Sequence, residues 1–176
     1  ARGRIISKFH EDKNGDIFIG TDDGGLFIYN PIKDKCHRYT IDKSNPNLNI
    51  HAIWSNDTYL WIGTYSKGLY RINHKTKYVE HIPYFEKDGI TNESIYSIHE
   101  DLSGKIWIGT KTAIWTWTKK HGFIKEKELG YNSDIIAICE DLKGSIWFAS
   151  LNKGILKYTP TTHNITHISK GSNGIK

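Results

Sequence analysis

One segment recurs four times in variant form along the 176-residue chain, and this recurrence constrains the fold more than any other feature. The copies cover residues 11–21, 55–64, 100–110 and 140–150. Gly20, Gly63, Gly109 and Ala149 hold equivalent positions in them, so the repeat is roughly 40 to 46 residues long. A period of this length, with several short strands in each unit, is typical of a β-propeller array. We therefore predict an all-β fold, a β-propeller fragment of four four-stranded antiparallel blades.

The repeat boundaries predict one domain. We expect residues 1–176 to form a single partial β-propeller with repeats at about 5–40, 50–82, 95–124 and 135–168. Residues 171–176 resemble the residues that open each repeat, so we expect a fifth repeat to begin there. Because the sequence contains no methionine, we also expect it to be a piece of a longer protein.

An arc of four blades would leave an apolar blade face open at each end, which is unfavourable in water. We therefore expect either a closed four-bladed ring or, preferably, two copies that associate through their open blade edges.

Each repeat begins with an alternating segment that carries a small residue at a fixed place. Ala52, Ser97 and Ala137 hold this place, and we assign Ser7 to it in the first repeat. Small residues suit an innermost strand, where the blades converge. A nearly continuous apolar run follows, as expected for a strand packed on both faces, and we expect its equivalent members Trp61, Trp107 and Trp147 to be core residues.

A turn of the pattern Asp-x-x-Gly joins these two strands in repeats one, three and four, at 12–15, 101–104 and 141–144. Aspartate suits the first turn position because its carboxylate accepts backbone N–H groups, and glycine suits the left-handed position at the end. The second repeat departs from this pattern, with Asn56 and Asp57 and no glycine.

The repeated acids Asp12, Asp57, Asp101 and Asp141 resemble the carboxylates of a glycosidase, but a residue repeated at a hairpin is better interpreted as a turn former. The sequence has no Gly-x-Ser-x-Gly elbow and no phosphate loop, and its nine histidines lack the spacing of a zinc site. We predict no enzyme activity, no metal and no cofactor.

The units resemble two-component regulator propeller repeats over nearly the whole chain. The third repeat carries the pattern Ile-x-x-Ile-x-Glu-Asp-x-x-Gly-x-Ile-Trp-Ile-Gly-Thr, and the first carries Gly-Gly-Leu-x-x-Tyr-x-Pro. The resemblance implies the periplasmic sensor region of a membrane-anchored hybrid two-component histidine kinase. It further implies a propeller that binds an extracellular signal, often an oligosaccharide, and regulates genes for glycan use.

Propellers usually bind ligands at one mouth of the ring, and variation among equivalent loops there is where recognition is expected. Four equivalent loops lie at 22–23, 65–67, 111–113 and 151–153. Aromatic rings can stack on sugars, and lysines can pair with carboxylate or sulfate groups. We therefore predict a ligand-binding site made by residues of these loops and the adjoining strand: Tyr65, Lys67, Lys111, Trp115 and Lys153. For Trp115, and for Trp117 two residues later on the same strand face, packing between blades is the alternative interpretation.

The formal net charge is +5, but no run of Lys or Arg exceeds two residues, so we predict no nucleic-acid partner. Our leading hypothesis is a non-catalytic sensor segment that binds a carbohydrate or a related small ligand. The first alternative is a protein-interaction or self-assembling propeller without a small ligand. The second is a lyase or glycosidase propeller, which lacks a recognisable acid pair here.

Overall fold

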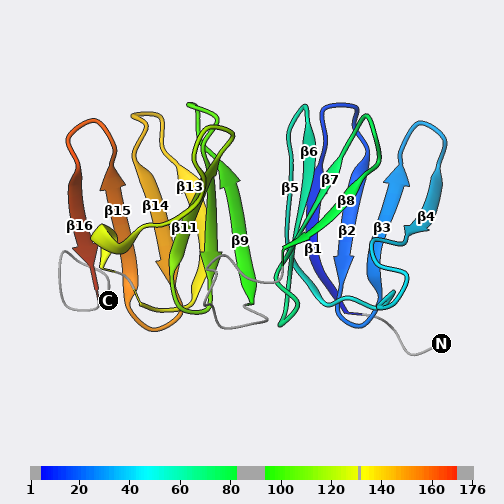
Figure 1. The fold of residues 1–176 in the computed structure, drawn as a ribbon, viewed down its shortest axis with the longest axis horizontal. Coiled ribbons are helices and arrows are strands. Elements are labelled where there is room, and N and C mark those ends of the chain that lie inside the picture. Colours follow the sequence, from blue (N-terminus) through cyan, green and yellow to red (C-terminus); the bar gives the residue numbers. More distant parts are fainter. Residues whose placement is uncertain (1–4, 83–93, 131, 170–176) are drawn as a thin grey trace. The chain divides into compact units, whose positions relative to one another are not determined.

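The computed structural model describes residues 5–82, 94–130 and 132–169, and it contains four four-stranded antiparallel sheets (Figure 1). In every sheet each strand pairs with the next one in the chain. A single turn of 3₁₀ helix, η1 (Lys127–Leu129), is the one helical element within these described ranges. The predicted all-β propeller with four blades of four strands is confirmed. Residues 171–176, where we expected a fifth repeat to begin, lie outside the described residues.

The chain divides into two compact units, Ala1–Ile95 and Tyr96–Lys176. Unit 1 contains blades 1 and 2, and unit 2 contains blades 3 and 4 apart from Ile95, the first residue of β9. The expectation of one continuous partial propeller over the whole chain stays a prediction.

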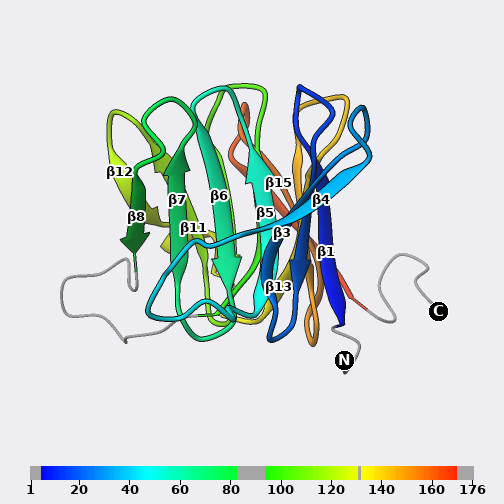
Figure 2. The ribbon, with the colours of Figure 1, turned by 90° about the vertical axis from the view of Figure 1, so that its right-hand side faces the viewer.

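The strands of blade 1 are β1 (Ile6–Glu11), β2 (Ile17–Thr21), β3 (Gly25–Asn30) and β4 (Lys35–Tyr39). Those of blade 2, which Figure 2 shows side by side in this order, are β5 (Ile50–Ser55), β6 (Tyr59–Thr64), β7 (Leu69–Asn73) and β8 (Val79–Ile82). Blade 3 consists of β9 (Ile95–Glu100), β10 (Ile106–Thr110), β11 (Ile114–Thr118) and β12 (Gly122–Lys125). Blade 4 consists of β13 (Ile135–Glu140), β14 (Ile146–Ser150), β15 (Gly154–Thr159) and β16 (Asn164–Ile168).

The Asp-x-x-Gly turns have the predicted chemistry. In the β9–β10 turn, Asp101 Oδ1 accepts the N–H groups of Ser103 at 2.9 Å and Lys105 at 3.0 Å, and Gly104 has a left-handed φ of 81°. Asp12 and Asp141 accept the corresponding backbone groups in their own turns. The interpretation of these three acids as turn formers is confirmed, since the hydrogen bonds hold the turns closed.

Blade 2 uses a different residue in its turn. Asn56 Oδ1 accepts the N–H groups of Thr58 at 3.0 Å and Tyr59 at 2.9 Å. Asp57, which we had grouped with the repeated acids, instead pairs with Lys13 of blade 1 at 2.5 Å. The residue equivalent to Asp101 is therefore Asn56, and the shorter turn places Asp57 at an exposed tip.

Within each unit, the first strand of one blade packs on a glycine in the second strand of the preceding blade. A Cβ added at Gly20 on β2 would lie 2.7 Å from Ile50 Cγ2 on β5 and 3.2 Å from Ile53 Cδ1. In unit 2, a Cβ at Gly109 on β10 would lie 2.6 Å from Ile135 Cγ2 on β13. The repeated glycine is thus required because a neighbouring blade approaches at this point.

The register of β1 corrects our assignment of Ser7. Lys8 pairs with Gly20, as Ala52 pairs with Gly63 in blade 2, so Lys8 holds the small-residue position and Ser7 precedes it. Both first strands have a register shift just before this position, which leaves one extra residue in the strand. The strand begins at Ile6 rather than at Ile5, and Lys8 lies four residues before Asp12, as Ser97 lies four residues before Asp101.

Candidate functional site

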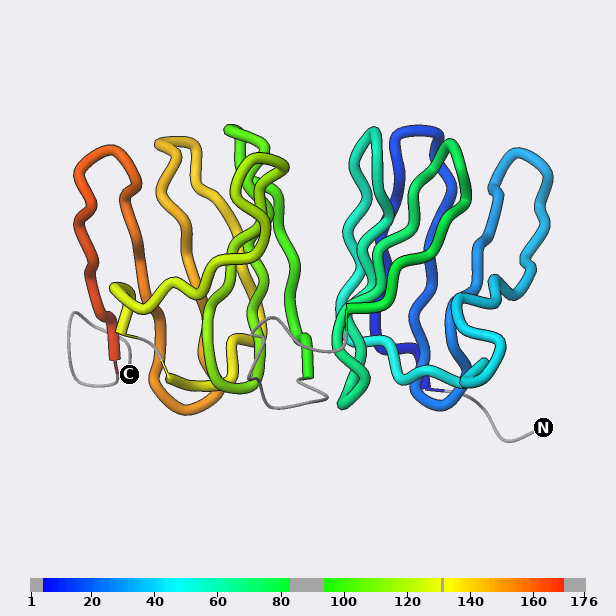
Figure 3. The backbone as a smooth tube through the Cα atoms, in the orientation of Figure 1, coloured from blue at the N-terminus to red at the C-terminus, as the bar shows by residue number. Residues whose placement is uncertain are grey.

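The four loops in which we predicted ligand recognition all connect the second and third strands of a blade, at one end of each sheet (Figure 3). A hydroxyl at the end of the second strand anchors each of them. Thr21 Oγ1 donates to Gly25 O at 2.8 Å, and Thr64 Oγ1 donates to Gly68 O at 2.6 Å. In unit 2, Thr110 Oγ1 bonds both the carbonyl and the N–H of Ala113, and Ser150 Oγ accepts the N–H of Lys153 at 3.1 Å. The repeated Thr or Ser therefore closes the loop, whatever residues lie within it.

In unit 1, these loops bring together a carboxylate, an imidazole and a phenol. His51 is the extra residue at the bulge of β5, and its Nε2 lies 3.4 Å from Asp22 Oδ1. The Tyr65 ring centroid is 5.6 Å from that of His51, and the tyrosine is 48% exposed. Bulges often redirect a side chain at functional sites. The Tyr65 ring thus has an open surface beside two polar side chains.

Asn49 ties the two loops of unit 1 to one another. Its carbonyl oxygen accepts the Tyr65 N–H at 2.9 Å, and its Oδ1 accepts the Asp23 N–H at 2.6 Å. Asp23 and Ser66, one in each loop, have left-handed backbone φ angles of 54° and 58°. Such angles are uncommon for residues other than glycine, and they indicate loops that their surroundings hold in place.

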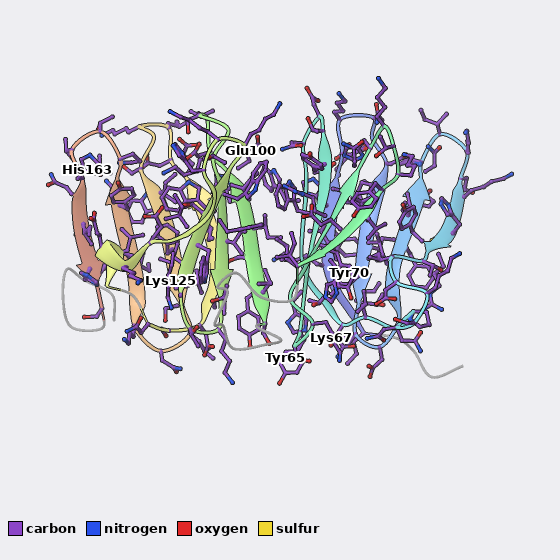
Figure 4. All side chains as sticks on the ribbon, viewed as in Figure 1. Tyr65, Lys67, Tyr70, Glu100, Lys125 and His163 are labelled. Carbon is purple, nitrogen blue, oxygen red and sulfur yellow. The ribbon has the colours of Figure 1, made fainter. Side chains whose placement is uncertain are left out.

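Lys67 is exposed on the same loop as Tyr65, and both side chains lie at the lower end of blade 2 in Figure 4. The His81 imidazole supports this loop, because its Nε2 is 2.7 Å from Lys67 O and its ring stacks on Tyr70 at 4.2 Å. Burial and the neighbouring Asp42 carboxylate raise the pKa of Tyr70 to about 12, so its hydroxyl stays protonated and donates to Asp42.

In unit 2, the predicted lysines Lys111 and Lys153 are both exposed on their loops. Trp115 differs from the prediction, since it lies on β11 with only 5% of its surface exposed. Lys125 Nζ on β12 lies 5.6 Å from the centre of its indole ring. We therefore correct the expectation that Trp115 offers an open ring for sugar stacking, because the strand face that carries it is buried.

A pocket of about 280 Å³ is lined in part by Lys125, the lysine next to this tryptophan. The residues that line it come from the loop after β10, the end of β12 and the connection to blade 4: Ala113, Lys125, Glu126, Lys127, Gly130 and Asn132. Thr116 Oγ1 donates to Glu126 Oε1 at 2.7 Å, and the Glu126 N–H donates to Ile114 O, so the pocket wall is fixed to β11. The 3₁₀ turn η1 ends at Gly130, which adopts the left-handed conformation.

Sequence reasoning missed both lysines of this pocket. It pointed to the short loops, and of those only the loop at 111–113 borders the pocket, through Ala113. Lys125 is instead the last residue of β12, and Lys127 begins η1 in the connection between blades 3 and 4. The available signal was the length of that connection together with its Gly130, since long connections between blades also contribute to a propeller mouth.

Among the described residues, no group of three or more His, Cys, Asp or Glu side chains is placed to hold a metal ion.

The described residues include no helix whose length and apolar character would let it cross a membrane.

No protein-family model matches the sequence. Among curated proteins, the chain is similar to histidine kinase P4 of Formosa agariphila, with 26% identity over 110 residues. The match covers 60% of this chain and 8% of the kinase.

Solved structures show the same fold. The extracellular domains of two putative hybrid two component systems from B. thetaiotaomicron superpose with TM-scores of 0.79 and 0.73, at 22% and 23% identity. These matches cover 94% and 96% of this chain but only 23% and 22% of the other two. Virginiamycin B lyase from Staphylococcus aureus superposes with a TM-score of 0.76 at 16% identity, over 97% of this chain and 57% of the lyase. The resemblance inferred from the repeats is thus confirmed, and the chain is a β-propeller fragment similar to the extracellular domains of hybrid two component systems.

Proposed function

We propose that the chain is part of the extracytoplasmic, periplasmic sensor region of a membrane-anchored two-component signalling protein. In this role it binds an anionic saccharide without changing it chemically, and binding regulates the use of glycans. The support for the sensor role is the similarity in fold to extracellular domains of hybrid two component systems, together with the similarity in sequence to a histidine kinase.

The pocket in unit 2 is the observation that indicates the chemical class of the ligand. Its polar lining consists of two lysines, one carboxylate and one amide, Lys125, Lys127, Glu126 and Asn132. The two lysines outnumber the single carboxylate, so the lining carries a net positive charge, and Thr116 holds Glu126 against β11. A carboxylate or sulfate on a sugar would pair with them, and the amide would bond a sugar hydroxyl. The volume of about 280 Å³ lies just below the usual range for ligand pockets, which favours one sugar unit at a time.

Calorimetric titration of the 176-residue chain tests this proposal. We expect heat from oligosaccharides that carry uronic acid or sulfate groups, and weaker heat from neutral ones. Lys127→Ala should weaken binding by roughly ten-fold, because a charge-assisted hydrogen bond is worth about 1.5 to 3 kcal/mol. Lys143→Ala, at the exposed β13–β14 turn of the same unit, is the matched control and should bind normally.

Two results would contradict the proposal. Equal affinity in Lys127→Ala and in the control would exclude this pocket as the site, and the loop lysines Lys67, Lys111 and Lys153 with Tyr65 would remain as the predicted alternative. Turnover of a polysaccharide would show an enzyme instead. The likeness to virginiamycin B lyase is one of fold at 16% identity, so it does not bring lyase activity to this chain.

A further inference from the structure

A carboxylate in the loops of unit 1 accepts no hydrogen bond from the described residues. It belongs to Asp22, the first residue after β2. Asp22 Oδ1 is buried and faces His51 Nε2 at 3.4 Å, a contact that lacks hydrogen-bond geometry. The side chain as a whole is 37% exposed, so Oδ2 is the oxygen that a ligand can reach. Because an ionised carboxylate only accepts hydrogen bonds, this place suits a ligand that supplies donors.

The backbone around Asp22 is held on both sides. Its N–H donates to Ile5 O at 2.9 Å, and the N–H of the next residue, Asp23, donates to Asn49 Oδ1 at 2.6 Å. The equivalent loop of blade 2 is held in the same way, since the Ser66 N–H donates to Ser94 Oγ at 3.1 Å. A ligand that binds at these loops does not have to order them first, which favours affinity.

The Tyr65 ring supplies an apolar surface beside this carboxylate. The His51 imidazole contacts both groups, because its Nε2 faces Asp22 and its ring centre lies 5.6 Å from that of Tyr65, at an angle of 34° between the planes. Tyr65 is half-exposed and lies at the lower end of blade 2 (Figure 4). A sugar ring presents a C–H face for stacking and hydroxyl donors at its rim, which matches an open aromatic ring next to a carboxylate.

The charges of these two loops differ from those of the pocket in unit 2. The β2–β3 loop carries two carboxylates, Asp22 and Asp23, whereas the β6–β7 loop carries one cation, Lys67. An acid group on a ligand would therefore meet more carboxylates than lysines, which is the reverse of the lining in unit 2. An uncharged sugar avoids this repulsion and still donates hydrogen bonds to Asp22.

We propose that unit 1 holds a second saccharide site, and that this site takes an uncharged sugar. Tyr65 stacks on the face of the sugar ring, and Asp22 Oδ2 accepts a hydrogen bond from one of its hydroxyl groups. The proposal goes beyond the function proposed above, which concerns an acidic saccharide in unit 2, and it does not depend on that pocket binding anything.

Calorimetric titration of the 176-residue chain with neutral oligosaccharides of glucose, galactose, mannose, xylose and arabinose tests the proposal. We expect at least one of them to bind. Tyr65→Ala should weaken that binding by about ten-fold, because the stacking surface and its apolar contact area are lost. Tyr78→Ala is the matched control, since it removes a tyrosine that is also exposed, at the β7–β8 turn of the same blade, and it should bind normally.

Asp22→Ala tests the carboxylate separately, and should weaken binding by about ten-fold because it removes a charged hydrogen-bond acceptor. Circular dichroism should show that all three variants fold, since none of these side chains is fully buried.

Three results would overturn the proposal. The first is no binding of any neutral oligosaccharide, and the second is equal affinity in Tyr65→Ala and Tyr78→Ala. The third is binding of glucosamine oligosaccharides alone, which would show a site for an ammonium group instead. These outcomes are separate from those for the pocket in unit 2, because that pocket is tested with acidic saccharides and Lys127→Ala.

Discussion

Blades 2 and 3 hold equivalent tryptophans in the core by different means. In blade 3, Trp107 Nε1 donates to Asp101 Oδ2 at 2.7 Å, and Lys105 Nζ lies 4.9 Å from the ring centre. In blade 2, Trp61 has no aspartate at the corresponding turn position. The Arg71 guanidinium lies 5.1 Å from the Trp61 ring centre and 4.7 Å from the Tyr59 ring centre. Its Nε–H and Nη2–H groups donate to Glu80 Oε2 at 3.0 Å and 2.5 Å.

The difference shows that the repeat keeps the tryptophan buried at an equivalent position, whereas the residues that contact it vary from blade to blade. In blades 3 and 4, one turn residue both closes the hairpin and anchors the tryptophan, and Asp141 bonds Trp147 as Asp101 bonds Trp107. In blade 2 the two tasks are divided, since Asn56 closes the turn and Arg71 covers the ring. Three variants would break or sharpen this comparison.

The largest effect is expected for Asp101→Ala. This side chain is nearly buried and accepts four hydrogen bonds from Ser103, Lys105 and Trp107, so its loss leaves several donors unpaired. We expect the free energy of unfolding, measured in urea, to fall by about 3 kcal/mol. Asn56→Ala in blade 2 is the control, and it should cost only about 1 kcal/mol because Trp61 does not depend on it. An equal loss of unfolding free energy in the two variants would show that the two turn residues contribute equally to stability.

The same aspartate makes the comparison dependent on pH. Burial alone would raise the pKa of Asp101, but the hydrogen bonds from Ser103, Trp107 and Lys105 outweigh it and hold the pKa below 3.8. Its contribution to stability is therefore complete above the unfolded value and is lost as the pH falls through the lowered value of the folded state. The free energy of unfolding should therefore fall more steeply in acid for the wild-type protein than for Asp101→Ala, which lacks this carboxylate.

Arg71→Met should have an intermediate effect. It removes the cation that lies between Tyr59 and Trp61 and leaves Glu80 without this partner, while it keeps most of the apolar stem. We expect a loss of about 1 to 2 kcal/mol in the free energy of unfolding, since the guanidinium is largely desolvated. Lys105→Met in blade 3 removes a cation from Trp107 but leaves the Asp101 bond, and should cost less than about 1 kcal/mol. A greater loss for Lys105→Met would reverse the comparison.

The smallest effect concerns the first strands, where Trp54 of blade 2 stands at the place of His99 in blade 3. Burial lowers the pKa of His99, although Glu140, Asp101 and Glu100 oppose this shift. Because the folded state holds the imidazole neutral, its contribution is complete above pH 6.5 and is lost as the pH falls from 6.5 through the lowered value. His99→Gln should flatten the dependence of stability on pH just below 6.5, and urea unfolding at a series of pH values would measure this. An unchanged slope would show that His99 does not titrate with folding.

The repeats predicted most of the fold, because period, turn residues and apolar alternation are local signals that four copies reinforce. The turn role of Asp101 followed from its spacing to Gly104. Its bond to Trp107 did not, although the same six-residue spacing from Asp141 to Trp147 was visible in the sequence. The Ser7 assignment was wrong because β1 begins at Ile6 rather than Ile5, and the spacing from Asp12 back to Lys8 was the signal that could have shown it.

The candidate site was less predictable. Exposure of Lys67, Lys111 and Lys153 followed from their loops, but the burial of Trp115 depends on how β11 packs in its unit. Lys125 lines the pocket from the end of β12 and Lys127 from the connection that follows, and the path of that connection is a property of tertiary structure. Side chains that converge from separate segments leave no shared pattern along the chain.

The hydroxyl at the end of each second strand has a consequence for how such a scaffold can diversify. Because Thr21, Thr64, Thr110 and Ser150 each fasten a short loop to its own strand, the residues between the fastening points do not hold the sheet together. These loop residues can be substituted in one blade at a time with little loss of stability in the sheet of that blade. A scaffold of this kind can acquire new ligand preferences without first acquiring spare stability.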